Sequence, residues 1–259
     1  MKKSFFDRQT TAVTALFSGE SITELTAKAR QAAADGADGI AVELLSLAPE
    51  FCTVDNFKAI IDAASLPSMF ICYRNHKWFG SDDDARQECL LKAAEAGAEV
   101  IDVMGDLYCP TPGELTTDIK AVEKQKKLIS EIHARGAKAL ISSHMNALEP
   151  KSAGEIMEIA NIQSERGADI CKIVTNGDTE EAFLEAIKAD IMLSKSFHKP
   201  FIHLTSGRFC KLHRFMGTKL GLAITFGVSG YDLTPYTQPL VRSFKTVRDT
   251  IPWDITDVF

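Results

Sequence analysis

The stretch "QSERGADICKIVT", residues 163–175, shows the local order from which most of the chain is built. A polar segment of helical character ends at Gly167, and an apolar, β-branched run follows from Asp169 to Thr175. Glycine commonly ends a helix because it adopts the left-handed conformation without a steric penalty. The stretch therefore predicts a helix, a glycine stop and a buried strand in direct succession.

The same phrase recurs before other apolar runs, as "DGADGI" (35–40), "AGAEVI" (96–101) and "RGAKAL" (135–140). Short apolar or β-branched runs alternate with longer amphipathic segments along the whole sequence, which is typical of repeated strand–helix units. The predicted strands are residues 12–18, 39–45, 68–74, 99–105, 138–144, 169–175, 200–206 and 222–228.

Eight such units, without a Pro/Gly/Ser-rich linker, predict an α/β protein with a single (β/α)₈ (TIM) barrel over residues 1–259. The length fits, because such a barrel typically needs about 250 residues. The alternative is a doubly wound sheet, which would more often carry a glycine-rich phosphate loop after its first strand. The sequence there reads "SGES" (18–21), which favours the barrel.

The composition argues against several classes of partner. A net charge of −6 and a pI near 5.6 leave no basic field to recruit nucleic acid or an anionic membrane. Neither a signal peptide nor an apolar span of membrane length is expected. The cysteines show no CxxC spacing, so we expect a reduced, cytoplasmic protein without disulfides. They are Cys52, Cys72, Cys89, Cys109, Cys171 and Cys210.

Lys172 lies at the centre of a strand in which an aliphatic residue would be ordinary. Lysine is rarely buried, because its ammonium must be paired or solvated. Lys172 could reach solvent or pair with a carboxylate; alternatively, an apolar pocket would favour its neutral, nucleophilic amine and Schiff-base chemistry. His144 ends the preceding strand, ~5 Å away in a sheet. Its imidazole suits proton transfer beside an iminium.

Other polar residues follow or end the predicted strands, where the loops of a barrel form its active site. Glu43 could order a substrate hydroxyl, bind a metal or pair with an arginine. Arg74 and Arg214 could bind a carboxylate through two hydrogen bonds, or brace loops by ion pairs. Asp102 could be a buried partner of a lysine, and it is left unassigned.

A metal site is an alternative use of the polar residues. It would combine Glu43 and Asp102 with the histidines at 76, 203 and 213. The HExxH motif is absent, and scattered histidines and acids are common in any barrel. We therefore expect no metal and no other cofactor.

Over most of its length the sequence resembles the type I 3-dehydroquinate dehydratase (type I dehydroquinase) family. The resemblance runs in order from "DGADGIAVELL" (35–45) to "LAITFGVSGYDLTP" (222–235), and its most specific pieces are "KALISSH" (138–144), "GADICKIV" (167–174) and "RFMGTKLGLAITFG" (214–227). It implies a (β/α)₈ lyase without a metal, commonly a homodimer, that dehydrates 3-dehydroquinate in the shikimate pathway of aromatic amino acid biosynthesis.

The resemblance also implies a role for each matched residue. Lys172 would form an iminium with the ring ketone of the substrate, and His144 would remove the α-proton and then help the β-hydroxyl to leave as water. Glu43 would hold substrate hydroxyls. Arg74 would bind substrate, and Arg214 would bind its carboxylate.

The sequence departs from the family pattern around the substrate. Leu45 stands where the family has an arginine, and Trp78 stands where it has the glutamate that supports the catalytic histidine. The closing "SAPGQ" loop of the family reads "LTPYTQ" (233–238), where Thr234 or Gln238 could substitute.

These observations predict a carbon–oxygen lyase that dehydrates 3-dehydroquinate, or a close carboxylated cyclic β-hydroxyketone, through a Schiff base. The partner is then a small keto acid. Two alternatives stay open: a related Schiff-base dehydratase or aldolase that acts on another keto substrate, and a non-catalytic barrel that binds a metabolite.

Overall fold

Eight parallel strands form one sheet that curls into a nearly closed barrel. The computed structural model describes residues 4–7, 9–231 and 238–255. Neighbouring strands follow one another in sequence, and the order β7-β6-β5-β4-β3-β2-β1-β8 places β1 between β2 and β8. The strands are β1 (Ala12–Ser18), β2 (Gly39–Glu43), β3 (Ser68–Ile71), β4 (Val100–Met104), β5 (Lys138–His144), β6 (Ile170–Asn176), β7 (Phe201–Ser206) and β8 (Ile224–Gly227).

A hydrogen bond from the Ala223 amide to the Phe201 carbonyl, 2.9 Å, links the entrance of β8 to β7 across the remaining seam. Because the first strand pairs with both the second and the last, the doubly wound alternative is excluded. The predicted (β/α)₈ barrel is confirmed.

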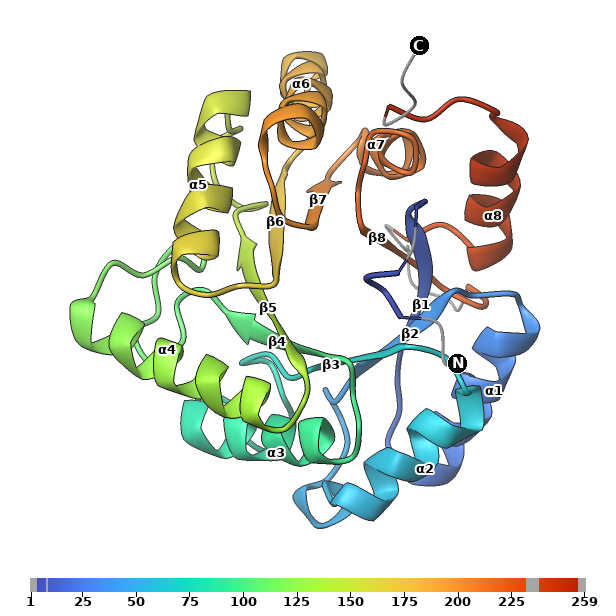
Figure 1. Cartoon of the computed structure of the whole chain (residues 1–259), viewed down its shortest axis with the longest axis vertical. Helices are drawn as coiled ribbons and strands as arrows, with labels where there is room; N and C mark the ends of the chain where they lie inside the picture. The colour runs from blue at the N-terminus through green and yellow to red at the C-terminus, as the bar shows by residue number, and fades with distance from the viewer. Residues whose placement is uncertain (1–3, 8, 232–237, 256–259) are drawn as a thin grey trace.

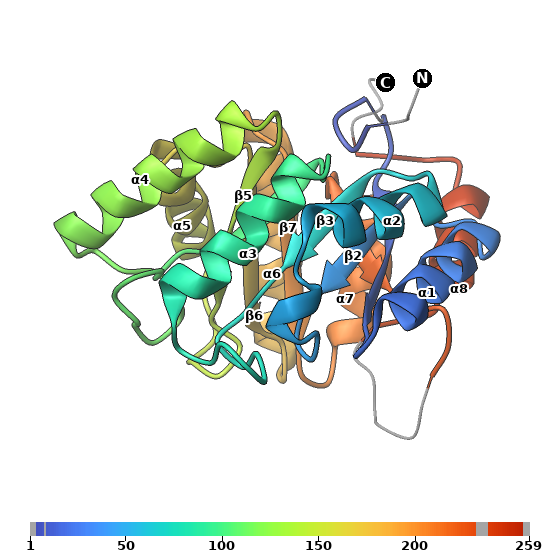
Figure 2. The ribbon, with the colours of Figure 1, turned by 90° about the horizontal axis from the view of Figure 1, so that it is seen from below.

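The helices form an outer ring around the strands (Figure 1), and the view turned by 90° shows them running alongside the sheet (Figure 2). None of the helices in the described ranges has the length and apolar content required to cross a bilayer. The helices are α1 (Ile22–Ala34), α2 (Val54–Ala64), α3 (Asp83–Glu95), α4 (Ile119–Ala134), α5 (Ala153–Glu165), α6 (Glu180–Ser196), α7 (Cys210–Gly217) and α8 (Val241–Thr250), and a 3₁₀ turn, η1, covers Pro49–Phe51.

The recurring glycine before a strand has a conformational cause. Gly36, Gly97, Gly136 and Gly167 have φ angles of 79°, 96°, 82° and 105°, a region that residues with a Cβ seldom adopt. Each lies just beyond the last residue of a helix, and a strand begins within three residues. The glycine stop predicted from the sequence is therefore confirmed, and it sets where four of the strands start.

Strand periodicity decides which side chains enter the barrel. In β6, Lys172 and Val174 line the interior cavity, whereas the Cys171 thiol contacts the Ala160 carbonyl of α5 on the outside. Lys172 is the third of the seven residues of β6, so it lies in the first half of its strand. Its long side chain carries the ammonium towards Glu43 and His144, the last residues of β2 and β5.

Candidate active site

The Lys172 ammonium lies in a cavity of about 200 Å³ that is lined mainly by residues of the barrel strands, and we call it the Lys172 pocket. Its walls combine apolar side chains with a small number of polar ones, the composition expected of a small-molecule site. The apolar residues are Leu16, Ile71, Val174, Leu204 and Phe226. The polar residues are Glu43, Tyr73, His144, Lys172, Arg214 and Gln238.

Lys172 is only 4% exposed, and its charge is paired inside the barrel. Its Nζ lies 3.3 Å from Asp102 Oδ2 and also donates a hydrogen bond to the Tyr73 hydroxyl. Asp102 Oδ1 accepts a hydrogen bond from Ser142, 2.6 Å. The cation at the centre of β6 is therefore stabilised by a buried carboxylate from β4, two strands away.

His144 ends β5, and a carboxylate holds its ring. The His144 Nδ1 lies 2.6 Å from Glu114 Oε2, and both side chains are about one quarter exposed (24% and 25%). The ring also makes a T-shaped contact with the ring of Tyr73, with ring centroids 5.0 Å apart and an interplanar angle of 84°. A carboxylate on one nitrogen fixes the orientation of the imidazole, which is what an acid–base histidine requires.

The resemblance left no partner for His144, since Trp78 replaces the glutamate of the family pattern. In the structure Trp78 is a surface residue, 56% exposed, in the loop after β3. Glu114 comes instead from the connection between β4 and α4, 36 residues further along the chain. Sequence reasoning missed Glu114. The available signal was an acidic residue in a long loop that follows a strand, and that signal is common in any barrel.

The backbone around Glu114 is fixed by close packing. Glu114 has a φ angle of 55°, and its carbonyl accepts a hydrogen bond from Ser143 Oγ, 2.9 Å. A Cβ at position 105 would lie 2.5 Å from that carbonyl oxygen, so the approach requires Gly105. Arg166 donates to the Gly105 carbonyl at 2.7 Å and to the Thr116 carbonyl. The loop is thus anchored at several points, and Glu114 is placed before any substrate binds.

Arg214 supplies a buried cation to the Lys172 pocket. It lies in α7, is 5% exposed, and its Nη2 donates a long hydrogen bond of 3.5 Å to the Thr205 carbonyl. Burial lowers the pKa of its guanidinium to about 10, still far above neutral pH. No carboxylate among the described residues pairs with it, and its Nε has no hydrogen-bond partner there. A buried, charged arginine without a counter-ion is a ready site for a substrate carboxylate.

Glu43 ends β2 and faces the Lys172 pocket. Burial raises the pKa of its carboxyl, and so does the Asp102 charge, while Lys172 and His144 act in the opposite direction. Gln238 lines the same cavity. Thr234 lies outside the described residues. The structure therefore brings five of the predicted site residues into one cavity, and their functional roles stay predictions. They are Glu43, His144, Lys172, Arg214 and Gln238.

Arg74 is placed differently from the other predicted residues. It lies beside the pocket, where two acids hold its guanidinium: Nε and Nη2 donate to Asp83 at 3.2 and 3.1 Å, and Nη1 donates to Asp106 at 2.6 Å. Its Nη2 also donates to the Asp106 carbonyl, 2.9 Å. This geometry fits the loop-bracing alternative better than substrate binding, because most of the donors of the guanidinium are already used.

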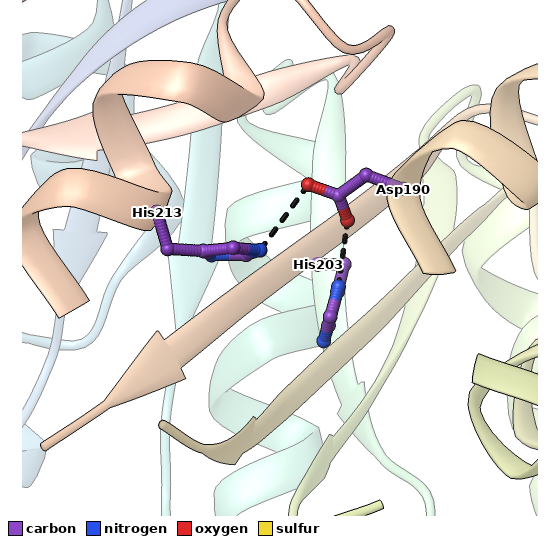
Figure 3. Close-up of side chains that lie close together, drawn as sticks. All are labelled: Asp190, His203 and His213. Carbon is purple, nitrogen blue, oxygen red and sulfur yellow. Dashed lines mark hydrogen bonds and ion pairs between the residues drawn. The ribbon is translucent and has the colours of Figure 1, made fainter. Parts of the chain in front are cut away.

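The set of residues considered for a metal is not brought together. Glu43 and Asp102 lie at the Lys172 pocket. In contrast, His203 of β7 and His213 of α7 lie around Asp190 of α6 (Figure 3). His76 accepts hydrogen bonds from two backbone amides of its own loop, each 3.1 Å long.

The cluster of Asp190, His203 and His213 is fully buried. His203 Nδ1 lies 2.6 Å from Asp190 Oδ1, and His213 Nε2 lies 3.2 Å from Asp190 Oδ2. Burial alone would raise the pKa of Asp190, but the two imidazoles more than offset it, so the net pKa is lowered. The three donor groups are close enough to share an ion, but Asp190 and the Thr175 hydroxyl (3.0 Å) already engage both ring nitrogens of His203. The cluster ties α7, and with it Arg214, to α6 and β7.

Comparison with known proteins identifies the family of the chain. The sequence model of the family described as type I 3-dehydroquinase matches residues 15–251. A 3-dehydroquinate dehydratase from Alkaliphilus oremlandii is 32% identical over 105 residues, which is 40% of this chain and 41% of the relative. One from Klebsiella pneumoniae subsp. pneumoniae is 26% identical over 192 residues, 72% of this chain and 70% of the relative. The chain thus spans less than half of the first relative and somewhat more than two thirds of the second.

Solved structures share the fold. The 3-dehydroquinate dehydratase from Geobacillus kaustophilus superimposes with a TM-score of 0.77 at 15% identity, over 93% of this chain and 91% of that chain. A type I enzyme from Clostridium difficile, solved with covalently modified comenic acid, gives a TM-score of 0.76 at 17% identity, over 93% and 92% of the two chains.

Proposed function

Because the chain belongs to the type I 3-dehydroquinase family, a family of enzymes, we propose that it dehydrates 3-dehydroquinate, or a close carboxylated cyclic β-hydroxyketone, through a Schiff base on Lys172. The observation that carries the proposal is the content of the Lys172 pocket. A buried primary amine, an imidazole held by a carboxylate and a buried unpaired arginine face one cavity. Amine, acid–base group and anion site are the parts that this reaction needs.

The proposed reaction begins with addition of the Lys172 nitrogen to the ring ketone. The nitrogen starts as an ammonium, two of its three protons pass to the ketone oxygen, and this oxygen leaves as water to give an iminium. The iminium withdraws electrons from the adjacent carbon, so His144 can remove its α-proton to give an enamine. The enamine expels the β-hydroxyl, which takes a proton from His144 and leaves as water. Hydrolysis of the conjugated iminium then returns the Lys172 ammonium and an enone.

Arg214 would bind the substrate carboxylate, and Glu43 and Gln238 would contact its hydroxyls. A substrate carboxylate would neutralise the guanidinium that the pocket leaves unpaired, which is a favourable exchange in a buried site. Location in the cytoplasm, a homodimeric assembly and a place in the shikimate pathway also belong to the proposal, and they rest on the family and on composition alone.

A second candidate keeps the Schiff-base chemistry but changes the substrate. Two of the three arginine contacts that the resemblance implies are not offered to a ligand: Leu45 replaces one, and Arg74 is held by Asp83 and Asp106. Only Arg214 then remains for an anionic group in the described pocket. A pocket that has lost polar contacts to a substrate discriminates less well in favour of that substrate. This favours a keto acid that requires fewer polar contacts than 3-dehydroquinate.

The proposal is tested by trapping the covalent intermediate and by measuring turnover. The protein is incubated with 3-dehydroquinate and borohydride, and the adduct is located by peptide mass spectrometry. With borohydride we expect one adduct, on Lys172. Without borohydride we expect formation of an ultraviolet-absorbing enone. An adduct without turnover would support the second candidate. Binding that leaves no adduct and is unchanged by Lys172→Ala would show a non-catalytic metabolite-binding barrel.

Glu114 gives a prediction that separates orientation of His144 from substrate binding. We expect Glu114→Gln to lower kcat by about 10- to 100-fold, the size of effect seen when a carboxylate behind a metal-bound histidine is removed. KM should change little, because Glu114 acts through His144. Glu123→Gln, an exposed residue of α4, is the matched control and should behave as wild type. A raised KM with unchanged kcat would instead place Glu114 in contact with substrate.

A further inference from the structure

Tyr73, which follows β3, occupies a position that the proposed reaction does not yet use. Its hydroxyl donates a hydrogen bond to Asp102 Oδ2, 2.8 Å, and accepts one from the Lys172 ammonium. The ring is also close to the charge, with Lys172 Nζ 5.1 Å from its centroid. The hydroxyl thus touches the nitrogen atom that would form the Schiff base.

The surroundings keep this hydroxyl protonated and oriented. Burial raises the pKa of the Tyr73 phenol well above its usual value, and the Asp102 carboxylate raises it further. Asp102 is itself held by Ser142 and Lys172, so the acceptor of the phenol proton is fixed. The Tyr73 hydroxyl is therefore neutral at physiological pH, and the Asp102 carboxylate accepts its hydrogen bond.

Formation of a Schiff base has a proton balance that fits such a group. The lysine nitrogen begins as an ammonium with three hydrogens and ends as an iminium with one. The ketone oxygen gains those two protons: one when the nitrogen–carbon bond forms and the carbinolamine appears, and one when the carbon–oxygen bond breaks and water leaves. Two protons must therefore pass from nitrogen to oxygen, and the two atoms share one carbon in the carbinolamine.

We propose that Tyr73 is a catalytic residue that carries these protons between Lys172 and the substrate oxygen, with Asp102 as its partner. This inference rests on the proposed Schiff-base function. In each transfer the phenol gives its proton to the oxygen and takes one from the nitrogen, so the hydroxyl is restored and no external acid is consumed. Hydrolysis of the product iminium uses the same route in reverse.

The geometry divides the proton transfers between two groups. Glu114 engages the His144 Nδ1, and the imidazole makes a T-shaped contact with the Tyr73 ring, so the imidazole is held for the carbon-bound proton and the departing β-hydroxyl. Tyr73 contacts the nitrogen and serves the carbon–nitrogen steps. Loss of either group should therefore slow a different step.

The test is the rate of covalent adduct formation in rapid-quench experiments with 3-dehydroquinate and borohydride, followed by intact mass. Tyr73→Phe keeps the ring and removes only the hydroxyl. We expect it to form the Lys172 adduct about 10²-fold more slowly than wild type, within the range of acid–base catalysis, and to reach the same final extent. Tyr108→Phe, in the next loop and with its ring beneath Lys124, loses the same atom and should react like wild type.

His144→Ala completes the comparison, because it should form the adduct at the wild-type rate and fail only afterwards. An unchanged trapping rate in Tyr73→Phe, with its melting temperature close to that of wild type, would overturn the proposal. A lower trapping rate in His144→Ala than in Tyr73→Phe would overturn it as well, because the imidazole would then serve the nitrogen. Absence of any adduct on the wild-type protein is a different result, and it would reject the Schiff-base function itself.

Discussion

Replacement of Lys172 by methionine is expected to reduce turnover of 3-dehydroquinate by about 10³-fold or more and to abolish the borohydride-trapped adduct, since a covalent route cannot proceed without its nucleophile. Methionine fills most of the space of the lysine stem but offers no amine. Steady-state assays of enone formation and intact mass measurements give the two readouts. Lys188→Met, an exposed lysine of α6 paired with Glu185, is the control and should retain full activity.

The same substitution should also lower stability, because it leaves Asp102 as a buried carboxylate without its cation. The side chains of Lys172 and Asp102 are 6% and 0% exposed, and breaking such a pair costs about 3–5 kcal/mol. The double variant Lys172→Met/Asp102→Asn removes both charges, and it should recover most of the free energy of unfolding without recovering activity. Denaturant unfolding measures the first change. Substantial activity in either variant would show that Lys172 is not the nucleophile.

Replacement of His144 by alanine is expected to lower kcat by about 10²- to 10⁴-fold, the range of a single acid–base group. Lys172 remains, so the adduct should still form and should now accumulate as the iminium of the undehydrated substrate. Borohydride trapping reads this directly, because the trapped masses before and after dehydration differ by one water molecule. Near-normal turnover of the variant would assign the α-proton to another group.

His198→Ala is the matched control for this substitution. His198 is exposed in the connection between α6 and β7, and its removal should change neither kcat nor the trapped mass. The pair of variants therefore separates a requirement for the imidazole at the end of β5 from a general effect of losing a histidine.

The barrel was predictable because its signals are local. The glycine with a positive φ before a strand, the period of apolar residues and the absence of a phosphate loop are all read within short windows of sequence. The unusual lysine in β6 and the histidine that ends β5 were found in the same way. Parallel neighbouring strands placed them side by side, and they line one cavity in the structure.

The partners of these residues were not predictable from local pattern. Asp102 and Lys172 lie in β4 and β6, and Tyr73 follows β3; the three meet only because the sheet curls into a barrel. Glu114 reaches His144 through a loop whose path depends on Gly105 and Arg166. The same holds for Arg74, which the resemblance matched to a substrate-binding role and which the structure pairs with Asp83 and Asp106.

The sequence by itself therefore determined the fold, the nucleophile candidate and the acid–base candidate, since periodicity and turn conformation are properties of adjacent residues. Only the tertiary structure decided what surrounds them: a tyrosine and a carboxylate around the amine, a relocated glutamate behind the imidazole, and one unpaired arginine in the pocket. Hydrogen bonds and ion pairs act over about 3 Å, and closure of the barrel brings residues that are 30 to 99 positions apart in the chain within that distance.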